Sequence, residues 1–137
     1  MSTEDRPVIY HNPKCGTSRN TLKILEAAGY DPEVVPYLET GWTEPHLRQL
    51  LADAGLTAHD VLRARGTPAE ELGLLKDGVS EDTILAAMTE HPILVERPIV
   101  RTAKGVKLCR PSETVLDLID RRPPADFVKE NGKPLDR

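Results

Sequence analysis

The spacing of apolar residues changes along this 137-residue chain, and the change restricts the folds that it can adopt. Short β-rich runs stand at Val8–Tyr10 and Val34–Tyr37, and another pair follows between Ile93 and Cys109. Between those runs the apolar residues recur at helical spacing, as at Leu47, Leu50 and Leu51. The sequence therefore predicts a strand–helix–strand unit, a helical insert, and then two strands and a helix.

Capping and turn residues indicate where these elements begin and end. The first long helix is expected to follow Cys15 and to stop at Gly29, and Ala103–Gly105 separates two strands of a hairpin. The further helices are expected to begin near Thr43, Thr57, Thr67, Ser80 and Pro111.

This order, βαβ, a helical insert and ββα, predicts an α/β fold of thioredoxin-like layout, in which helices flank a small mixed sheet. At 137 residues one domain is expected over residues 1–137, with loosely ordered termini at 1–6 and 123–137.

Composition excludes several classes of function. The formal net charge of −4 argues against binding to nucleic acid, which needs clustered cations. No apolar run approaches the ~20 residues that a membrane span needs, and the polar N-terminus lacks the pattern of a secretory signal. The expected location is therefore the cytoplasm. The four histidines and two cysteines lack the spacing of metal ligands, so no metal site is expected.

Cys15 is the candidate nucleophile. It directly precedes a helix, whose unpaired N–H groups favour a thiolate, and His11 and Arg19 lie nearby in the sequence. Gly16 allows a ligand to approach the backbone closely, and Thr17 and Ser18 supply hydroxyl donors. The alternative is a buried, inert cysteine in a loop.

Four ordered segments resemble the signature stretches of the glutaredoxin-linked arsenate reductases of the ArsC type, which share a thioredoxin-like superfamily with the Spx regulators. The resemblance runs from about Val8 to Ile119, which is nearly the whole domain. The segments are Tyr10–Asn20, Glu70–Leu74, His91–Val100 and Leu108–Glu113.

The resemblance implies that Arg63, Arg97 and Arg110 hold the substrate oxyanion. Arsenate, like phosphate, carries about −1.5 to −2 near neutral pH, and the thiolate brings the total to nearly −3. Three guanidinium groups would offset that charge, and their planar forks suit an oxyanion. The alternative is that each arginine is a solvated surface charge, and Arg65 competes with Arg63 for the role. The resemblance also implies that His11 stabilises the thiolate, and the alternative is a polar residue at a strand end. It implies that Pro98 follows a cis peptide bond, and the alternative is a trans proline that starts an edge strand.

The resemblance further implies a mechanism without a bound cofactor. The Cys15 thiolate attacks arsenate with loss of water, glutathione reduces the arsenic while it stays bound to Cys15, and glutaredoxin resolves the mixed disulfide before arsenite leaves. Position 18 is Ser18, so no CxxC is present, and Cys109 is expected to be a buried structural cysteine. The resolving thiol would then come from outside, with glutathione as co-substrate. Arsenate, glutathione and glutaredoxin are the expected partners.

Two other functions remain open from the sequence. An Spx-like regulator would sense thiol stress without catalysis, although such proteins usually carry a CxxC. A related thiol oxidoreductase would act on another oxyanion or on a glutathione mixed disulfide.

Overall fold

A computed structural model describes residues 6–136 of the chain. Its contacts divide the chain into two units, one made of the residues up to Pro36 and from Arg97 onward, the other of Tyr37–Glu96. The single domain expected from the length stays a prediction. The expectation for residues 1–5 and 137 lies outside the described residues. No helix within residues 6–136 is long and apolar enough to cross a lipid bilayer.

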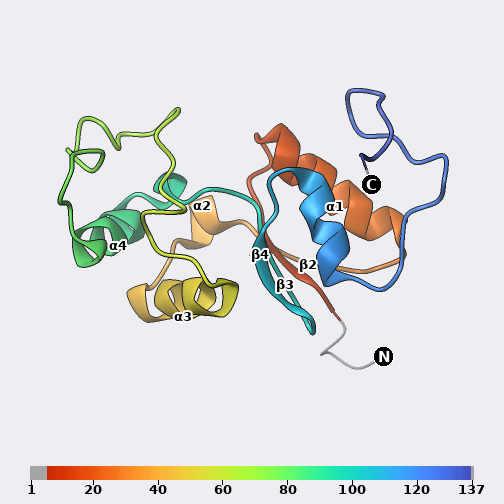
Figure 1. The fold of residues 1–137 in the computed structure, drawn as a ribbon, viewed down its shortest axis with the longest axis horizontal. Helices are drawn as coiled ribbons and strands as arrows, with labels where there is room; N and C mark the ends of the chain where they lie inside the picture. The colour runs from red at the N-terminus through yellow and green to blue at the C-terminus, as the bar shows by residue number, and fades with distance from the viewer. Residues whose placement is uncertain (1–5, 137) are drawn as a thin grey trace. The chain divides into compact units, whose positions relative to one another are not determined.

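The first unit contains a four-stranded sheet (Figure 1). The strand order is β2-β1-β3-β4, in which β1 runs parallel to β2 and antiparallel to β3, and β3 and β4 form a hairpin. The small mixed sheet predicted from the sequence is therefore confirmed. The strands are β1 (Val8–Tyr10), β2 (Glu33–Val35), β3 (Ile99–Thr102) and β4 (Gly105–Leu108).

Helix α1 (Gly16–Ala27) and the 3₁₀ helix η3 (Ser112–Leu118) share one hydrophobic core with the sheet. The paired residues Ile9 and Val100 contribute the centre of β1 and β3 to that core. The predicted last helix is thus present, but it is 3₁₀ over its length. Its buried Ser112, Val115 and Leu118 recur every three residues, which is the period of a 3₁₀ helix.

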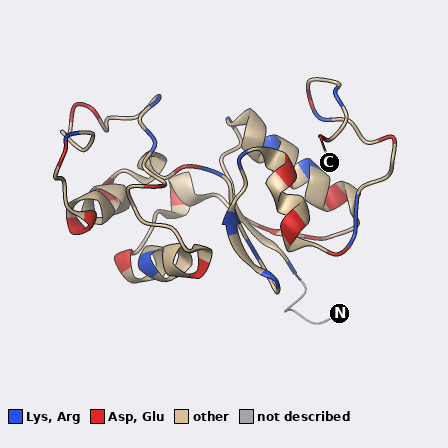
Figure 2. Ribbon diagram, in the orientation of Figure 1, with Lys and Arg blue, Asp and Glu red and all other residues tan. Residues whose placement is uncertain are grey.

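The second unit is helical, as predicted, with α2 (Tyr37–Thr40), α3 (Glu44–Ala54), α4 (Glu81–Glu90) and the 3₁₀ helix η2 (Pro92–Leu94). The hydroxyl of Thr43 caps α3 by accepting from the His46 N–H, and Gly55 ends that helix at φ 70°. Ser80 caps α4 in the same way. Acidic residues occupy the first turn of α3 and α4 (Figure 2), where the helix dipole favours them.

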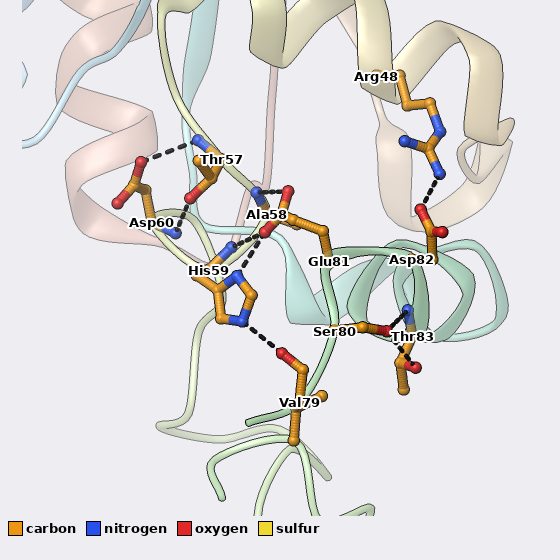
Figure 3. A network of polar contacts seen from close by, with 10 residues as sticks. All are labelled: Arg48, Thr57, Ala58, His59, Asp60, Val79, Ser80, Glu81, Asp82 and Thr83. Atoms are coloured by element: carbon orange, nitrogen blue, oxygen red, sulfur yellow. Dashed lines mark hydrogen bonds and ion pairs between the residues drawn. The ribbon is translucent and has the colours of Figure 1, made fainter. Parts of the chain in front are cut away.

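The predicted helix at Thr57–Leu62 is absent. Thr57 and Asp60 do form the reciprocal hydrogen bonds of a capping box. However, the carboxylate of Glu81 accepts the N–H groups of Ala58 and His59, and the chain continues as turns (Figure 3). Side-chain contacts from α4 therefore hold this segment.

Three other sequence predictions need correction. The helix expected near Thr67 is limited to helical turns, and Gly73 there has φ 74°. Tyr37 begins α2 and does not extend β2, and its ring stacks on Trp42 at 5.3 Å between centroids. The apolar run at Pro92–Leu94 is η2 and not a strand. At Tyr37, packing within the unit outweighs local propensity.

Glu113 of η3 is buried to 2 % exposure and forms an ion pair with Lys129 at 2.7 Å. Its carboxylate also accepts the Asp136 N–H at 3.1 Å and the Ser112 hydroxyl at 3.1 Å. Burial raises the pKa of Glu113, but these donors outweigh it and lower the pKa to about 2. Ionised Glu113 therefore stabilises the first unit.

This shift predicts an acid-dependent stability difference between the parent chain and Glu113→Gln. The folded-state pKa lies below the unfolded one, so the stabilisation is present above pH ~4.3 and is lost as pH falls toward about 2. Chemical denaturation at several pH values should show Glu113→Gln less stable near neutrality, with the difference shrinking below pH ~4. A difference that stays constant down to pH ~2 would contradict this assignment.

Candidate active site

The turn between β1 and α1 places Cys15 at the start of α1. The side chain of Asn12 accepts the Lys14 N–H at 2.9 Å, and its carbonyl accepts the Cys15 N–H at 3.0 Å. Cys15 is the N-cap residue of α1, with extended backbone angles, and is 8 % exposed. The thiol therefore lies where the unpaired N–H groups of the helix favour an anion.

Donors from three segments of the chain surround the sulfur of Cys15. Nη1 of Arg110 donates to it at 3.7 Å, and the Ser18 N–H and the guanidinium of Arg97 act on its charge. Burial alone raises the pKa of Cys15, but these donors and the charge of Arg97 outweigh it and lower the pKa. The net effect favours the thiolate, which is the nucleophilic form.

Arg97 and Arg110 are held together beside the thiol. Nη1 of Arg110 also donates to the Arg97 carbonyl at 3.0 Å. Arg97 is 9 % exposed, and its buried Nε and Nη1 have no hydrogen-bond partner among the described residues. Unpaired buried donors are costly in a folded protein, so these two guanidinium nitrogens are suited to an oxyanion. The peptide bond before Pro98 is cis, as the family resemblance implied.

His11 contacts Ser18. Its Nδ1 lies 2.6 Å from the Ser18 hydroxyl oxygen, which also accepts the Asn12 N–H at 3.1 Å. Burial, and then the charge of Arg19, lower the pKa of His11, so the imidazole is neutral near pH 7. The structure thus connects His11 to Cys15 through Ser18, and thiolate stabilisation by His11 stays a prediction.

The three residues after Cys15 were expected to bind substrate. The Ser18 hydroxyl is fully buried and bonded to His11 and Asn12, so its N–H is the group that faces the sulfur. Gly16 and Thr17 form the first turn of α1. A Cβ at Gly16 would meet Arg19 at 3.7 Å, an ordinary contact. Their contact with substrate stays a prediction.

Arg63 belongs to the second unit. Its Nη1 forms an ion pair with Glu96 at 2.8 Å, its Nε donates to the Arg65 carbonyl, and its own N–H donates to Leu94. Arg65 is exposed, so Arg63 is the more firmly held of the two arginines. Its expected place beside Cys15 stays a prediction.

A polar network supports the chain that leads to Arg63. His59 bridges the Glu81 carboxylate, at 2.5 Å, and the Val79 carbonyl, at 2.8 Å (Figure 3). The hydrogen bond to Val79 and the Glu81 carboxylate raise the pKa of His59. His59 therefore ties the turn before Arg63 to the beginning of α4.

Cys109 is fully buried, as expected, and its structural role stays a prediction. Burial raises the pKa of Cys109 to about 12, so its thiol stays protonated and unreactive. Among residues 6–136, no cluster of three or more potential metal ligands is present.

Sequence reasoning missed two ion pairs near the predicted site residues. Glu96 pairs with Arg63, and Glu130 pairs with Arg19 in the first turns of α1. The second pair joins residues 111 positions apart, and no local pattern could indicate it. The first could have been considered from the charge of Glu96 beside Arg97.

The sheet, α1 and the activated thiol define a protein of thioredoxin-like α/β fold with an electropositive cysteine site at a helix N-terminus. A profile of the ArsC family matches residues 10–118. The chain belongs to the ArsC family, as the resemblance indicated.

Named relatives agree with this assignment. An arsenate reductase ArsI1 of Synechocystis sp. is 57 % identical over 131 residues, covering 96 % of this chain and 91 % of the relative. An arsenate reductase of Escherichia coli is 49 % identical, with 91 % and 89 % covered. A solved arsenate reductase from Vibrio cholerae superposes with a TM-score of 0.80 at 41 % identity, covering 85 % of this chain and all of that one.

The environment of Cys15 predicts how the two thiols react. Alkylation of the native protein by iodoacetamide should proceed at Cys15 with an inflection below the free-thiol value of about 8.5. Arg110→Gln should move that inflection upward, because it removes a donor to the thiolate. Cys109 should react only after unfolding. Rates measured against pH, with peptide mapping, check this. An inflection at or above about 8.5 in the parent chain would contradict it.

Proposed function

We propose that this chain is an arsenate reductase in which the Cys15 thiolate is the nucleophile. The observation that carries the proposal is the buried thiol beside Arg97, whose Nε and Nη1 have no partner in the described residues. The arsenate reductases among its relatives support the choice of oxyanion.

Charge complementarity supports oxyanion binding next to the thiol. Arsenate at about −1.5 to −2, added to a thiolate, would be strongly repelled without fixed cations. Arg97 and Arg110 supply two such cations at the sulfur. Arg63 would supply a third, but Glu96 already neutralises part of its charge. We therefore assign most of the binding of arsenate to Arg97 and Arg110.

The proposed reaction balances as a two-electron reduction. The Cys15 thiolate forms a sulfur–arsenic bond as one arsenic–oxygen bond breaks, and the oxygen leaves as water after it is protonated. A glutathione thiol then displaces a second oxygen, again as water. The thiol of glutaredoxin then attacks the glutathione sulfur, and a disulfide forms between them. The electron pair of the broken sulfur–arsenic bond stays on arsenic, whose oxidation state falls from +5 to +3. Hydrolysis releases arsenite and the Cys15 thiolate.

We assign the reducing thiols to glutathione and glutaredoxin, with no bound cofactor. Ser18 stands where a CxxC would carry its second cysteine, and Cys109 is fully buried with a protonated thiol. Both observations argue for an external resolving thiol. Such a reaction fits the reducing cytoplasm, where we place the protein.

The two cysteines should differ sharply in a turnover assay. Cys15→Ser should abolish arsenite formation, because an unactivated hydroxyl is a far weaker nucleophile than a thiolate. Cys109→Ser should retain most activity. Arsenite would be measured with purified protein, glutathione and glutaredoxin, omitting each thiol source in turn. Loss of activity in Cys109→Ser, or turnover in Cys15→Ser, would reverse the assignment. Turnover without either thiol source would overturn the proposed donors.

Lysine substitutions test the arginine grip. Arg97→Lys or Arg110→Lys keeps the charge but removes the fork that can hold two oxygens. Losing one charge-assisted hydrogen bond should cost roughly 1.5–3 kcal/mol, or about one to two orders of magnitude in kcat/KM. Arg63→Lys should also lower kcat/KM. Its matched control is Arg65→Lys, at an exposed position two residues away. If all four variants match the parent chain, the arginines do not bind substrate.

A further inference from the structure

The C-terminal segment 123–136, here called the strap, is a folded part of the first unit. Val128 and Pro134 form an antiparallel bridge, and the Lys129 N–H donates to the Lys133 carbonyl at 2.8 Å. Phe127 and Leu135 pack against the core shared by α1 and η3. In Figure 1 the dark-blue strap turns back toward α1. These contacts therefore hold the tip of the strap, which carries Lys129 and Glu130, in a defined position.

Lys129 at this tip holds the beginning of η3. Its ammonium lies 2.7 Å from the Glu113 carboxylate, and the two side chains are 13 % and 2 % exposed. Glu113 follows Arg110 by three residues. An ion pair this buried fixes both partners, since removing one leaves an uncompensated charge in the core. Lys129 thus restrains the chain that carries Arg110.

The next residue, Glu130, holds the beginning of α1. Its two carboxylate oxygens accept Nε and Nη2 of Arg19, at 2.9 and 3.1 Å, and its N–H donates to the Asn20 side chain. Nη1 of Arg19 donates in turn to the Pro13 carbonyl at 2.9 Å. Glu130 is therefore connected, through Arg19, to the turn that carries Cys15.

We propose that Lys129 and Glu130 are positioning residues of the active site, which hold the chain segments of Arg110 and Cys15 at a fixed separation. Lys129 binds Glu113, three residues after Arg110, and Glu130 binds Arg19, in the helix that follows Cys15. The side chains of Arg110 and Cys15 meet at 3.7 Å. The consequence for arsenate rests on the proposed function. The consequence for the thiol does not.

A double-mutant cycle tests whether Lys129 acts through Arg110. In the parent chain, Lys129→Met should lower kcat/KM for arsenate about tenfold, mainly through KM, and should move the alkylation inflection of Cys15 upward. In the Arg110→Gln background it should change kcat/KM less than about twofold and leave the inflection in place. Lys129→Arg should restore parent behaviour. Lys133→Met, the same change at an exposed position of the strap, is the control.

Equal fold-losses in both backgrounds, or no loss in either, would overturn the proposal. If circular dichroism shows that Lys129→Met is unfolded, Glu113→Gln combined with Lys129→Met removes both charges and takes its place in the cycle. If the parent chain forms no arsenite, the proposed function fails. The alkylation arm, which needs no arsenate, then decides on the strap.

The Glu130 contact is tested by the same readout. Glu130→Gln weakens the connection through Arg19 to the Pro13 carbonyl, so the Cys15 inflection should move to higher pH, as in Lys129→Met. A shift to lower pH would mean that Glu130 acts only by neutralising Arg19 and would also remove it from the proposal. Asp126→Asn makes the same charge change at an exposed position of the strap and should leave the inflection in place. Equal inflections in the two variants would remove Glu130 from the proposal.

Discussion

The first unit must stabilise the thiolate of Cys15, an anion that burial destabilises. Burial opposes the thiolate of Cys15, so the donors that stabilise it must be fixed before any substrate arrives. The Ser18 N–H comes from α1, Arg97 from the chain before β3, and Arg110 from the chain after β4. The order of the sheet serves this requirement, because β1 pairs directly with β3 and β3 with β4.

The same arrangement explains why the site suits a second anion. The charge of Arg97 favours the thiolate, and two of its buried guanidinium nitrogens have no hydrogen-bond partner among the described residues. Arg110 is fixed by the Arg97 carbonyl, so the two guanidinium groups are preorganised as one cationic pair. A neutral substrate would not neutralise the two guanidinium groups, whereas an oxyanion would pair with both of them.

The sequence predicted what local chemistry determines and missed what distant contacts determine. The strand, turn and helix around Cys15 follow from β-rich and helix-forming residues in succession, and the caps at Thr43 and Ser80 from side chains that bond their own backbone. Residues 57–62 carry an equally good helix signal, but the chain there pairs at Leu62 with Val95, a residue 33 positions away. The contacts of Lys129 and Asp136 with Glu113 join residues 16 and 23 positions apart, so no local sequence pattern predicts them.

Reduction of arsenate through a covalent bond to Cys15 is tested most directly by mass spectrometry. The protein would be incubated with arsenate and glutathione, without glutaredoxin, and its peptides mapped. We expect an arsenic- and glutathione-containing adduct on the Cys15 peptide, which is absent from Cys15→Ser and is removed when glutaredoxin is added. Arsenite formation at an undiminished rate with Cys15 replaced, or an adduct confined to Cys109, would contradict it.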